Sequence, residues 1–541
     1  MELISWLTGQ RFRRQSSTKK ARSSYIMADL VENLMPPRAW FLFLFLAFLF
    51  FVHYYWFTTA KTGQPEHGRR LPPSPLALPI IGHLHLVGSL PHVSLTSLAR
   101  KHGPDVMLLR LGAVPTLVVS SLRAAEAVLR THDHVFASRP RYMVADIITY
   151  GSLDVAFAPY GEYWRKARKL LTTHLLSAKR VQSFRSAATE EVSMVIAKIN
   201  KAAEVGGTVD MSELLNSFTN DIACRIVSGK SFLKEGQSKL FRDLIKDSSL
   251  LLGGFNLEDY FPALTRVEIL KRAVGAKAVR VRNRWADMLD KVIDDHVDKD
   301  MSTFDHNDVD FVDILVSIQQ EYDLTRDHMK ALLTNVFFGA IDTSYNTLEF
   351  TLAELMRRPH LMGKLQDEVR SIVPLGQETI SEINMSNMTY LRAVIKESLR
   401  LHPVAPLLVP RLSMADCNIS GYMVPAGTRV LVNTWAIGRD PTSWEDAKQF
   451  IPERFIEGGS DLHVSFKGND FRFLPFGAGR RMCPGMNLAI VNVELMLANL
   501  MYHFDWELPL GVHREDIDMS EVFGLTVRRK EKLLLIPKAR M

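Results

Sequence analysis

The chain has 541 residues, of which 47% are hydrophobic and 23% are charged, and its formal net charge is +7. This composition excludes a disordered or fibrous protein and allows several average domains or one large core. The three cysteines, Cys224, Cys417 and Cys483, form neither a disulfide framework nor a CxxC zinc pattern, which indicates a reducing compartment. Basic residues do not gather with aromatic ones, so nucleic acid is not an expected partner.

The first pattern along the chain is an apolar run at residues 39–57, AWFLFLFLAFLFFVHYYWF. About twenty apolar residues span the core of a bilayer, and tryptophan near each end suits the two interfaces. The run therefore predicts a transmembrane anchor, with a lipid membrane as partner. A buried core helix and a cleaved signal peptide are disfavoured, because the run is nearly unbroken and no small-residue cleavage site follows it.

The charges that flank this run support two opposite orientations. The basic residues of the first 22 positions would hold that end in the cytosol and place the rest of the chain in the lumen. If translation begins at Met27, the acidic residues that follow outweigh Arg38, and the positive flank comes after the run. We interpret residues 1–26, within an N-terminal extension at 1–38, as an addition that the working protein lacks.

The remaining chain predicts a linker and one large domain. Residues 58–84 are polar and then rich in proline, which favours a stiff, extended arm. We expect a single domain at 85–541, with a strand pair at 106–121 and long helices between 160 and 400. Strand-like patterns recur at 408–433 and near the C-terminus. The expected fold class is mainly α with small β-sheets.

A long apolar helix is predicted at 328–359, where Pro359 stops it. Asp342 and Thr343 stand side by side in its middle, among apolar neighbours. Two interpretations remain open from this stretch alone. The helix surface turns out to solvent there, or the polar pair is kept inside because a reaction needs a proton.

The loop FLPFGAGRRMCPG at 473–485 has the features that a thiolate ligand needs. Its glycines leave room for a flat group to approach the backbone, and a helix expected after Pro484 favours the anionic form of Cys483. Arg480 and Arg481 offer cations to an acidic group on the cofactor. A cysteine-nucleophile hydrolase is disfavoured, because no histidine in the loop is placed to activate the thiol.

Five positions of this loop, Phe476, Gly479, Arg481, Cys483 and Gly485, match the haem-binding signature FxxGxRxCxG. The chain after the linker therefore resembles the cytochrome P450 family. The resemblance implies that the Cys483 thiolate is the axial ligand of haem b. It also implies that the other four residues surround this cofactor.

Two further motifs stand in the order that this family shows. KESLR gives Glu397 and Arg400, which share a helix face, and PERF gives Arg454. In the family these three side chains would form a buried ionic network with a structural role. By the same resemblance, WRKAR supplies Trp164 and Arg168 as partners of a haem propionate, and Arg411 and Arg481 are further partners. The alternative for each arginine is a solvated surface charge.

GAIDTS at 339–344 resembles the oxygen-activation motif of the family. The resemblance gives Asp342 and Thr343 a catalytic role, the relay of protons to dioxygen. Ala340 occupies a position where glycine is usual, and its methyl group would narrow the oxygen groove. The retained Thr343 favours oxygen insertion over the isomerase and dehydratase branches of the family.

Three features are similar to the plant microsomal A-type branch of the family: the predicted anchor, FDWELP at 504–509 and VFGLT at 522–526. The sequence as a whole resembles grass enzymes that oxidise indole-derived defence compounds. This resemblance implies a single-pass protein of the endoplasmic reticulum membrane whose catalytic domain faces the cytosol. Electrons would come from NADPH through a separate NADPH–cytochrome P450 reductase, because the chain has no Rossmann fingerprint. Arg480 and Lys467 would suit an acidic face of that reductase.

The resulting hypothesis is a membrane-anchored haem-thiolate monooxygenase. It would insert one oxygen atom from O2 into a mostly apolar small organic molecule, a plant specialised metabolite of the indole type or of the benzoxazinoid pathway. The pocket expected by resemblance draws on residues 142–157, Phe337–Thr343, Val404–Val409 and Val522–Thr526. The alternatives are a haem-thiolate enzyme that rearranges or dehydrates its substrate, and a haem sensor or ligand carrier without turnover.

Overall fold

The computed structural model describes residues 41–43, 45–50, 70–229, 238–254, 256–266, 268–297, 309–380 and 382–540. The described residues from Arg70 onward form one compact unit. Within the described residues, no helix has both the length and the apolar character needed to cross a bilayer. The expected extension at 1–38 and most of the expected anchor at 39–57 lie outside the described residues.

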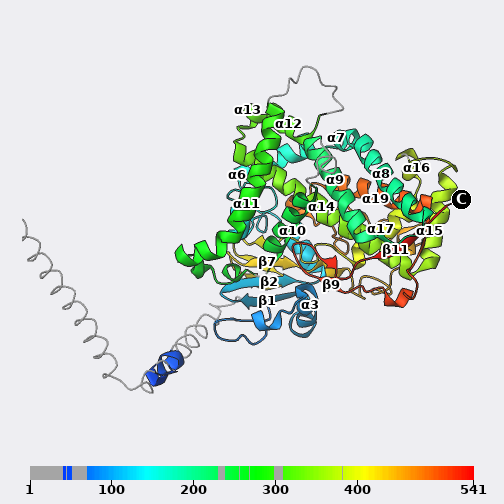
Figure 1. Cartoon of the computed structure of the whole chain (residues 1–541). Coiled ribbons are helices and arrows are strands. Elements are labelled where there is room, and N and C mark those ends of the chain that lie inside the picture. Colours follow the sequence, from blue (N-terminus) through cyan, green and yellow to red (C-terminus); the bar gives the residue numbers. More distant parts are fainter. Residues whose placement is uncertain are drawn as a thin grey trace, which may run out of the picture. The chain divides into compact units, whose positions relative to one another are not determined.

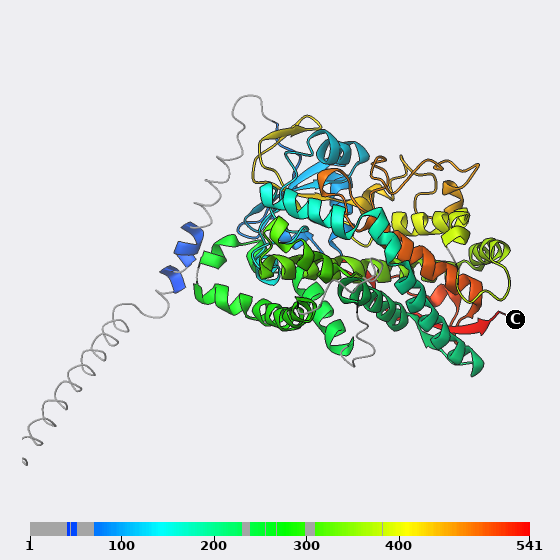
Figure 2. The ribbon, with the colours of Figure 1, turned by 90° about the horizontal axis from the view of Figure 1, so that it is seen from above.

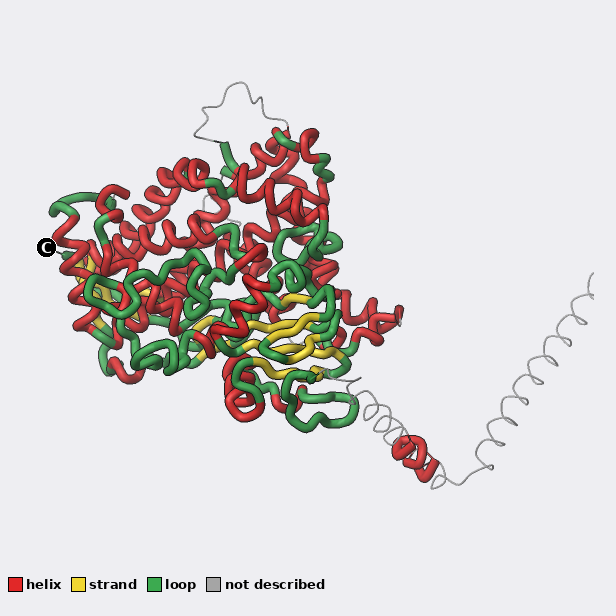
Figure 3. Tube along the Cα trace, turned by 180° about the vertical axis from the view of Figure 1, so that it is seen from behind, coloured by secondary structure: helices red, strands yellow, loops and turns green. Residues whose placement is uncertain are grey.

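The unit that begins at Arg70 is mainly helical, with its largest sheet gathered on one side (Figures 1 and 3). Its helices are α3 (Pro91–His102), α4 (Leu122–Glu126), α5 (Met143–Ile148), α6 (Glu162–Leu170), α7 (Ala178–Ser183), α8 (Arg185–Glu204), α9 (Met211–Ser228), α10 (Ser238–Gly253), α11 (Glu268–Val297), α12 (Phe311–Ser317), α13 (Gln319–Tyr322), α14 (Arg326–Arg357), α15 (Pro359–Ile372), α16 (Glu382–Ser386), α17 (Thr389–Leu401), α18 (Thr434–Ile437) and α19 (Met486–His503). The strands are β1 (Val106–Leu111), β2 (Val114–Val119), β3 (Val209–Asp210), β4 (Arg411–Leu412), β5 (Cys417–Ile419), β6 (Tyr422–Val424), β7 (Arg429–Val432), β8 (Phe504–Glu507), β9 (Glu521–Val522), β10 (Arg528–Arg529) and β11 (Leu534–Ala539). The expected class, mainly α with small sheets, is confirmed.

The largest sheet has the strand order β1-β2-β7-β4. The strand pair predicted at 106–121 is its antiparallel β1–β2 hairpin, which turns at Gly112 with φ +62°. A side chain at Gly112 would also lie 2.5 Å from the carbonyl oxygen of Tyr260, so glycine is required there on two counts. Strand β7 pairs in parallel with β2 and aligns Arg429 with Thr116. The sheet thereby joins the N-terminal hairpin to the segment that precedes the cysteine loop.

The proline-rich segment from Arg70 onward lies against strand β1 of this sheet and strand β6 of the two-stranded β5–β6 sheet. The amide of Leu108 donates to the carbonyl of Pro73 at 2.9 Å, and the amide of Met423 donates to the carbonyl of Arg70 at 2.8 Å. Proline lacks a donor, but the carbonyl groups of an extended segment still accept hydrogen bonds from an edge strand. These two bonds make the segment from Arg70 part of the compact unit.

Helix α14 crosses the helical part of the unit and packs against α9, α17 and α19 (Figures 1 and 2). Thr325 caps its first turn, because the Thr325 hydroxyl accepts from the amide of His328. The helix ends at Arg357, and Pro359 occupies the first turn of α15, where its missing N–H costs nothing. The long helix predicted at 328–359 is confirmed with these limits.

A buried ionic cluster attaches the C-terminal loop to the helices. Glu521 accepts from His92 Nε2 at 2.8 Å, and its other oxygen lies 3.9 Å from His402 Nδ1. His402 Nε2 also bonds to Glu354 of α14 at 2.7 Å. Burial alone would raise the pKa of Glu521, but its interactions with His402 and His92 outweigh burial and lower the pKa to about 2. The cluster therefore holds the Glu521 carboxylate ionised inside the protein.

Replacing Glu521 by glutamine is expected to destabilise the protein at neutral pH by about 3 kcal/mol, the equivalent of the lowered pKa. Because the pKa of Glu521 in the folded protein lies below its ordinary value of 4.5, this stability is present above pH 4.5 and is lost as the pH falls towards 2. Urea unfolding of the wild type and Glu521→Gln between pH 7 and pH 3 measures the difference. The two curves should converge in acid. Glu515→Gln, an exposed carboxylate nearby, serves as the control, and a pH-independent gap would contradict the expectation.

Candidate active site

The cysteine loop holds Cys483 directly before the first turn of α19, as the sequence predicts. The amide of Cys483 donates to the carbonyl of Phe476 at 2.9 Å, and the amides of Gly485 and Met486 point at the sulfur. Burial raises the pKa of the thiol, while these amides and Arg168 lower it. The Cys483 side chain is nevertheless accessible. The sulfur is therefore accessible although its surroundings are largely desolvated, and a ligand atom for a bound cofactor needs this combination.

Glycine is needed in this loop for a reason that differs in part from the expected one. Gly479 has φ +69°, and a side chain there would lie 2.3 Å from the carbonyl oxygen of Leu129. The protein's own backbone, and not only an approaching cofactor, therefore excludes a side chain at Gly479. Gly477 has a similar φ of +67°, but its nearest neighbour, the Leu408 side chain, would be 3.6 Å away. A side chain at Gly485 would face the Cys483 sulfur at 4.0 Å.

The contrast between these glycines gives a direct prediction. Gly477→Ala is expected to cost about 1 kcal/mol, the strain of a left-handed residue with a side chain. Gly479→Ala adds a clash with the Leu129 carbonyl and is expected to cost at least about 3 kcal/mol. Thermal unfolding of the two variants measures both effects. Equal losses of stability in the two alanine variants would contradict this expectation. They would show that the positive φ alone sets the cost, and that the backbone near Leu129 shifts to make room for the new side chain.

Arg481 is surrounded by backbone carbonyl groups. Its guanidinium donates to Ala137 at 2.6 Å, to Val155 at 3.1 Å and to Ala158 at 2.6 Å. It also lies over the ring of Trp164, 4.1 Å from the centroid, and the Trp164 indole donates to the same Val155 carbonyl. Arg481 therefore joins the cysteine loop to residues 137–158, in addition to supplying a buried positive charge.

Arg411 and Arg139 extend this positive charge. Arg411 donates to the carbonyl of Ala478 at 2.9 Å, and Arg139 donates to the carbonyls of Val409 and Pro410 at 2.6 and 2.9 Å. The sequence did not indicate Arg139, because it stands in a loop without periodicity or motif. Only the fold brings it to Arg411.

The electrostatics of this cluster fit an anionic cofactor. Burial and the neighbouring arginines lower the pKa of Arg139. Burial lowers the pKa of Arg411 to about 10. Burial and the charge of Arg411 together lower the pKa of Arg481 to about 9. Burial, opposed by Cys483, lowers the pKa of Arg168 as well. Several buried cations crowd together beside a ligand cysteine, which is the donor set that haem and its two propionates require. The residues present therefore fit the group.

Asp342 and Thr343 point in different directions from α14. The Asp342 carboxylate accepts a hydrogen bond from Ser249 of α10, and burial raises its pKa despite this bond and the charge of Arg528. The Thr343 hydroxyl donates to the carbonyl of Gly339 at 2.6 Å, one turn earlier. Gly339 is accessible although it lies within a buried helix, and a side chain there would meet nothing within 4 Å. The Gly339–Thr343 face thus borders open space.

Two neighbours of this pair differ from expectation. Ala340 lies towards α9 and α19, where it borders a small cavity with Ala223 and Leu488. Its methyl group therefore does not share the face of Gly339 and Thr343. Phe337 packs against Phe241 and Trp285 in the core and does not border the pocket described below. The helical repeat explains both, because residues three or four apart share a face and their immediate neighbours do not.

Glu397, Arg400 and Arg454 meet as the motifs predict. Arg400 donates to both carboxylate oxygens of Glu397 at 2.7 Å, and Arg454 Nε donates at 3.2 Å. The amide of Ile451 adds a fourth bond to the carboxylate at 2.7 Å. Arg400 also donates to the carbonyls of residues 438, 447 and 449. The network ties α17 to the segment before the cysteine loop.

Comparison with known proteins agrees with this geometry. The family model of cytochrome P450 matches residues 72–536. An indole-2-monooxygenase of Zea mays is 57% identical over 471 residues, 87% of this chain and 87% of that protein. A 3-hydroxyindolin-2-one monooxygenase of Zea mays is 54% identical over 487 residues, 89% of this chain and 91% of that protein. A zebrafish cytochrome P450 solved with progesterone superimposes with a TM-score of 0.71 at 26% identity, and the match covers 83% of this chain and 99% of that one.

The chain belongs to the cytochrome P450 family. It is an oxidoreductase of the monooxygenase kind, and its cofactor is haem held by a cysteine thiolate. The resemblance to plant enzymes, and within them to grass enzymes that oxidise indole-type compounds, is confirmed as a similarity.

Proposed function

We propose that this protein hydroxylates a small indole-type or benzoxazinoid-pathway compound, using O2 and electrons from NADPH. The observation that carries the substrate class is the 57% identity to a Zea mays indole-2-monooxygenase over 87% of both chains. The arrangement of Cys483 and the buried arginines supports the same chemistry, because it provides both a sulfur ligand and a charge match for haem.

Haem bound at Cys483 would supply the activation of dioxygen. The protein's own part begins with the amides of Gly485 and Met486, which stabilise the thiolate. Trp164, Arg168, Arg411 and Arg481 would hold the propionate side.

In this proposal, Asp342 and Thr343 deliver the protons that the reaction needs. Burial raises the pKa of Asp342, so its carboxyl group holds a proton more readily than an exposed one, with the Ser249 hydroxyl as its hydrogen-bond partner. The Thr343 hydroxyl donates to the Gly339 carbonyl. To donate a proton into the space beside Gly339, that hydroxyl must first rotate away from the carbonyl. Glu397, Arg400 and Arg454 have a structural role in this proposal.

The cellular setting is part of the same proposal. The apolar run at 39–57 supports a single-pass anchor in the endoplasmic reticulum membrane, with the catalytic domain in the cytosol. The electron donor would be the membrane-bound NADPH–cytochrome P450 reductase. Arg480 and Lys467 are exposed on the cysteine-loop side and offer positive charge to it, although Arg480 shares its charge with Asp133 at 3.3 Å.

The test combines spectroscopy with turnover. The dithionite-reduced, carbon-monoxide-bound membrane fraction should show a strongly red-shifted Soret band, which Cys483→Ala should abolish. Reconstituted with reductase and NADPH, the wild type should oxidise indole, indolin-2-one or 3-hydroxyindolin-2-one. A normal spectrum with product formed equally well without NADPH would favour a rearranging enzyme. A normal spectrum without product from any substrate would favour a sensor or carrier. No haem signal in folded protein would overturn the proposal.

A further inference from the structure

Helix α10 lies beside the middle of α14 and carries a serine, Ser249, that contacts the proposed proton donor. The Phe241 ring of α10 packs edge-on against Phe337 of α14, with the ring centroids 4.9 Å apart. Further along α10, the Ser249 hydroxyl donates to Oδ2 of Asp342. This bond links α10 directly to the carboxyl group that is proposed to supply protons.

Ser248 and Ser249 are neighbours in α10 but bond to different helices. The Ser248 hydroxyl accepts from the Trp285 indole of α11 at 3.0 Å and donates to the carbonyl of Leu244, one turn earlier, at 2.7 Å. The Ser249 hydroxyl reaches α14 instead. Successive residues are about 100° apart around a helix, so neighbouring serines meet different partners. Ser248 therefore anchors α10 to α11, whereas Ser249 contacts Asp342.

The Ser249 bond acts on both the direction and the protonation of the Asp342 side chain. It engages one carboxyl oxygen, Oδ2. An aspartate side chain turns about two bonds, so a hydrogen bond to one oxygen restricts where the other oxygen, Oδ1, lies. Burial raises the pKa of Asp342, and the Ser249 bond and, to a smaller extent, the charge of Arg528 oppose burial.

The elements around Asp342 carry several other titratable groups. They are Arg528 of β10, Lys246 and Asp247 of α10, Arg284 of α11 and Tyr345 of α14. Asp247 and Arg284 pair with each other at 3.0 Å, and Lys246 is exposed. Arg528 is exposed as well, so water and salt screen its charge. Helix α9 packs on another face of α14, the one with the small cavity. Ser249 is therefore the contact that most favours the ionised carboxylate.

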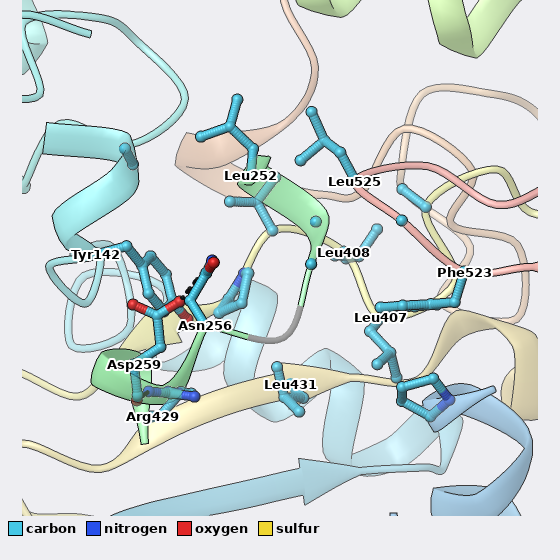
Figure 4. A pocket seen from close by; sticks show the side chains of 18 of the residues that line it. Tyr142, Leu252, Asn256, Asp259, Leu407, Leu408, Arg429, Leu431, Phe523 and Leu525 are labelled. Atoms are coloured by element: carbon cyan, nitrogen blue, oxygen red, sulfur yellow. Dashed lines mark hydrogen bonds between the residues drawn. The ribbon is translucent and has the colours of Figure 1, made fainter. Parts of the chain in front are cut away.

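The end of α10 is held firmly beside a pocket above the large sheet. Leu252, three residues beyond Ser249, contributes to the pocket wall together with Leu408 and Leu525 (Figure 4). A side chain at Gly253 would lie 1.7 Å from the amide nitrogen of Leu525, so α10 ends in close contact with the loop at 523–525. A residue that positions another side chain needs such a fixed support.

We propose that Ser249 is a positioning residue for Asp342: its hydroxyl holds one carboxyl oxygen at α10, so that the other oxygen keeps a fixed place for taking up and releasing a proton. The inference rests on the proposed role of Asp342 in proton supply. Only the carboxyl proton moves, and Ser249 keeps its own. A neutral donor suits this task, because a cationic partner at the same place would favour the ionised form much more strongly.

Infrared spectroscopy of the resting, haem-loaded protein tests the proposal without turnover. The carbonyl stretching band of protonated Asp342 is the one that Asp342→Asn removes, and its intensity is followed against pH. Ser249→Ala should move the midpoint of this titration to higher pH by about one pH unit, because loss of a hydrogen bond to a carboxylate disfavours the ionised form. Ser249→Thr keeps a hydroxyl and should restore the midpoint. An unchanged midpoint in Ser249→Ala overturns the proposal.

Turnover with reductase and NADPH separates positioning from packing. The substrate is whichever of indole, indolin-2-one and 3-hydroxyindolin-2-one the wild type oxidises. Ser249→Ala should lower kcat about 10-fold and change KM less than about 2-fold, because the loss concerns proton delivery and not binding. The fall of kcat in alkali should move to higher pH together with the infrared midpoint.

Ser248→Ala is the matched control on the same helix. It removes the partner of the Trp285 indole, so it should lower the melting temperature and leave both kcat and the infrared midpoint near wild-type values. The proposal is overturned if Ser249→Ala behaves in the same way, or if its infrared midpoint moves while kcat stays unchanged. Failure of the proposed function is distinguishable, because it appears in the wild type, as a missing carbon monoxide band or missing product.

Discussion

Replacing Glu397 by glutamine is expected to destabilise the protein by about 3–5 kcal/mol and to prevent recovery of haem-loaded protein. The carboxylate receives four hydrogen bonds, from Arg400, Arg454 and the amide of Ile451, and neither arginine has appreciable access to solvent. Removing one partner of a buried ion pair leaves an uncompensated charge inside the protein, and this is far more costly than the pair is stabilising. Denaturant unfolding and the yield of Soret-absorbing protein measure the loss.

The control for Glu397→Gln is an ion pair that faces solvent and includes a neighbour of Arg454. Lys364 lies 2.7 Å from Glu453, a residue of the PERF turn, and its side chain is 55% exposed. Lys364→Ala should therefore change stability by no more than about 0.5 kcal/mol. A similar small effect for both variants would mean that the protein relaxes around Arg400, and that the network is not structurally essential.

Replacing Arg481 by methionine is expected to have the second largest effect. Three hydrogen bonds, to the carbonyl groups of Ala137, Val155 and Ala158, are lost, and only Val155 keeps another donor, the Trp164 indole; at about 1 kcal/mol each the loss is about 3 kcal/mol. The same change removes a cation from the cluster that fits the haem propionates. The ratio of Soret to protein absorbance should therefore fall together with the melting temperature.

Arg481→Lys separates the two contributions of this residue. Lysine keeps the positive charge, but its single ammonium group cannot reach all three carbonyl groups as the planar guanidinium does. We expect a melting temperature close to that of Arg481→Met and a haem content between that variant and the wild type. A lysine variant with full stability would show that charge alone matters, and would contradict the carbonyl contacts as the cause.

Short-range patterns in the sequence identified much of the protein. The spacing around Cys483 predicted a ligand loop before a helix, because a helix start and a glycine turn are local features. KESLR placed Glu397 and Arg400 on one helix face for the same reason, and alternation gave the strand pair at 106–121. In each case the residues that interact are near one another in the chain.

The tertiary structure alone decided the contacts between distant segments. Glu521 meets His92, and Arg429 meets Asp259, from opposite parts of the sequence. Gly479 owes its constraint to the Leu129 carbonyl, which no local pattern reveals. The sequence by itself identified the class of cofactor site, through the resemblance of the cysteine loop to a family signature that lies within a few residues. Only the packing of the folded chain decided which buried charges lie close together. Burial and Coulomb interactions depend on distance in space and not on distance along the chain.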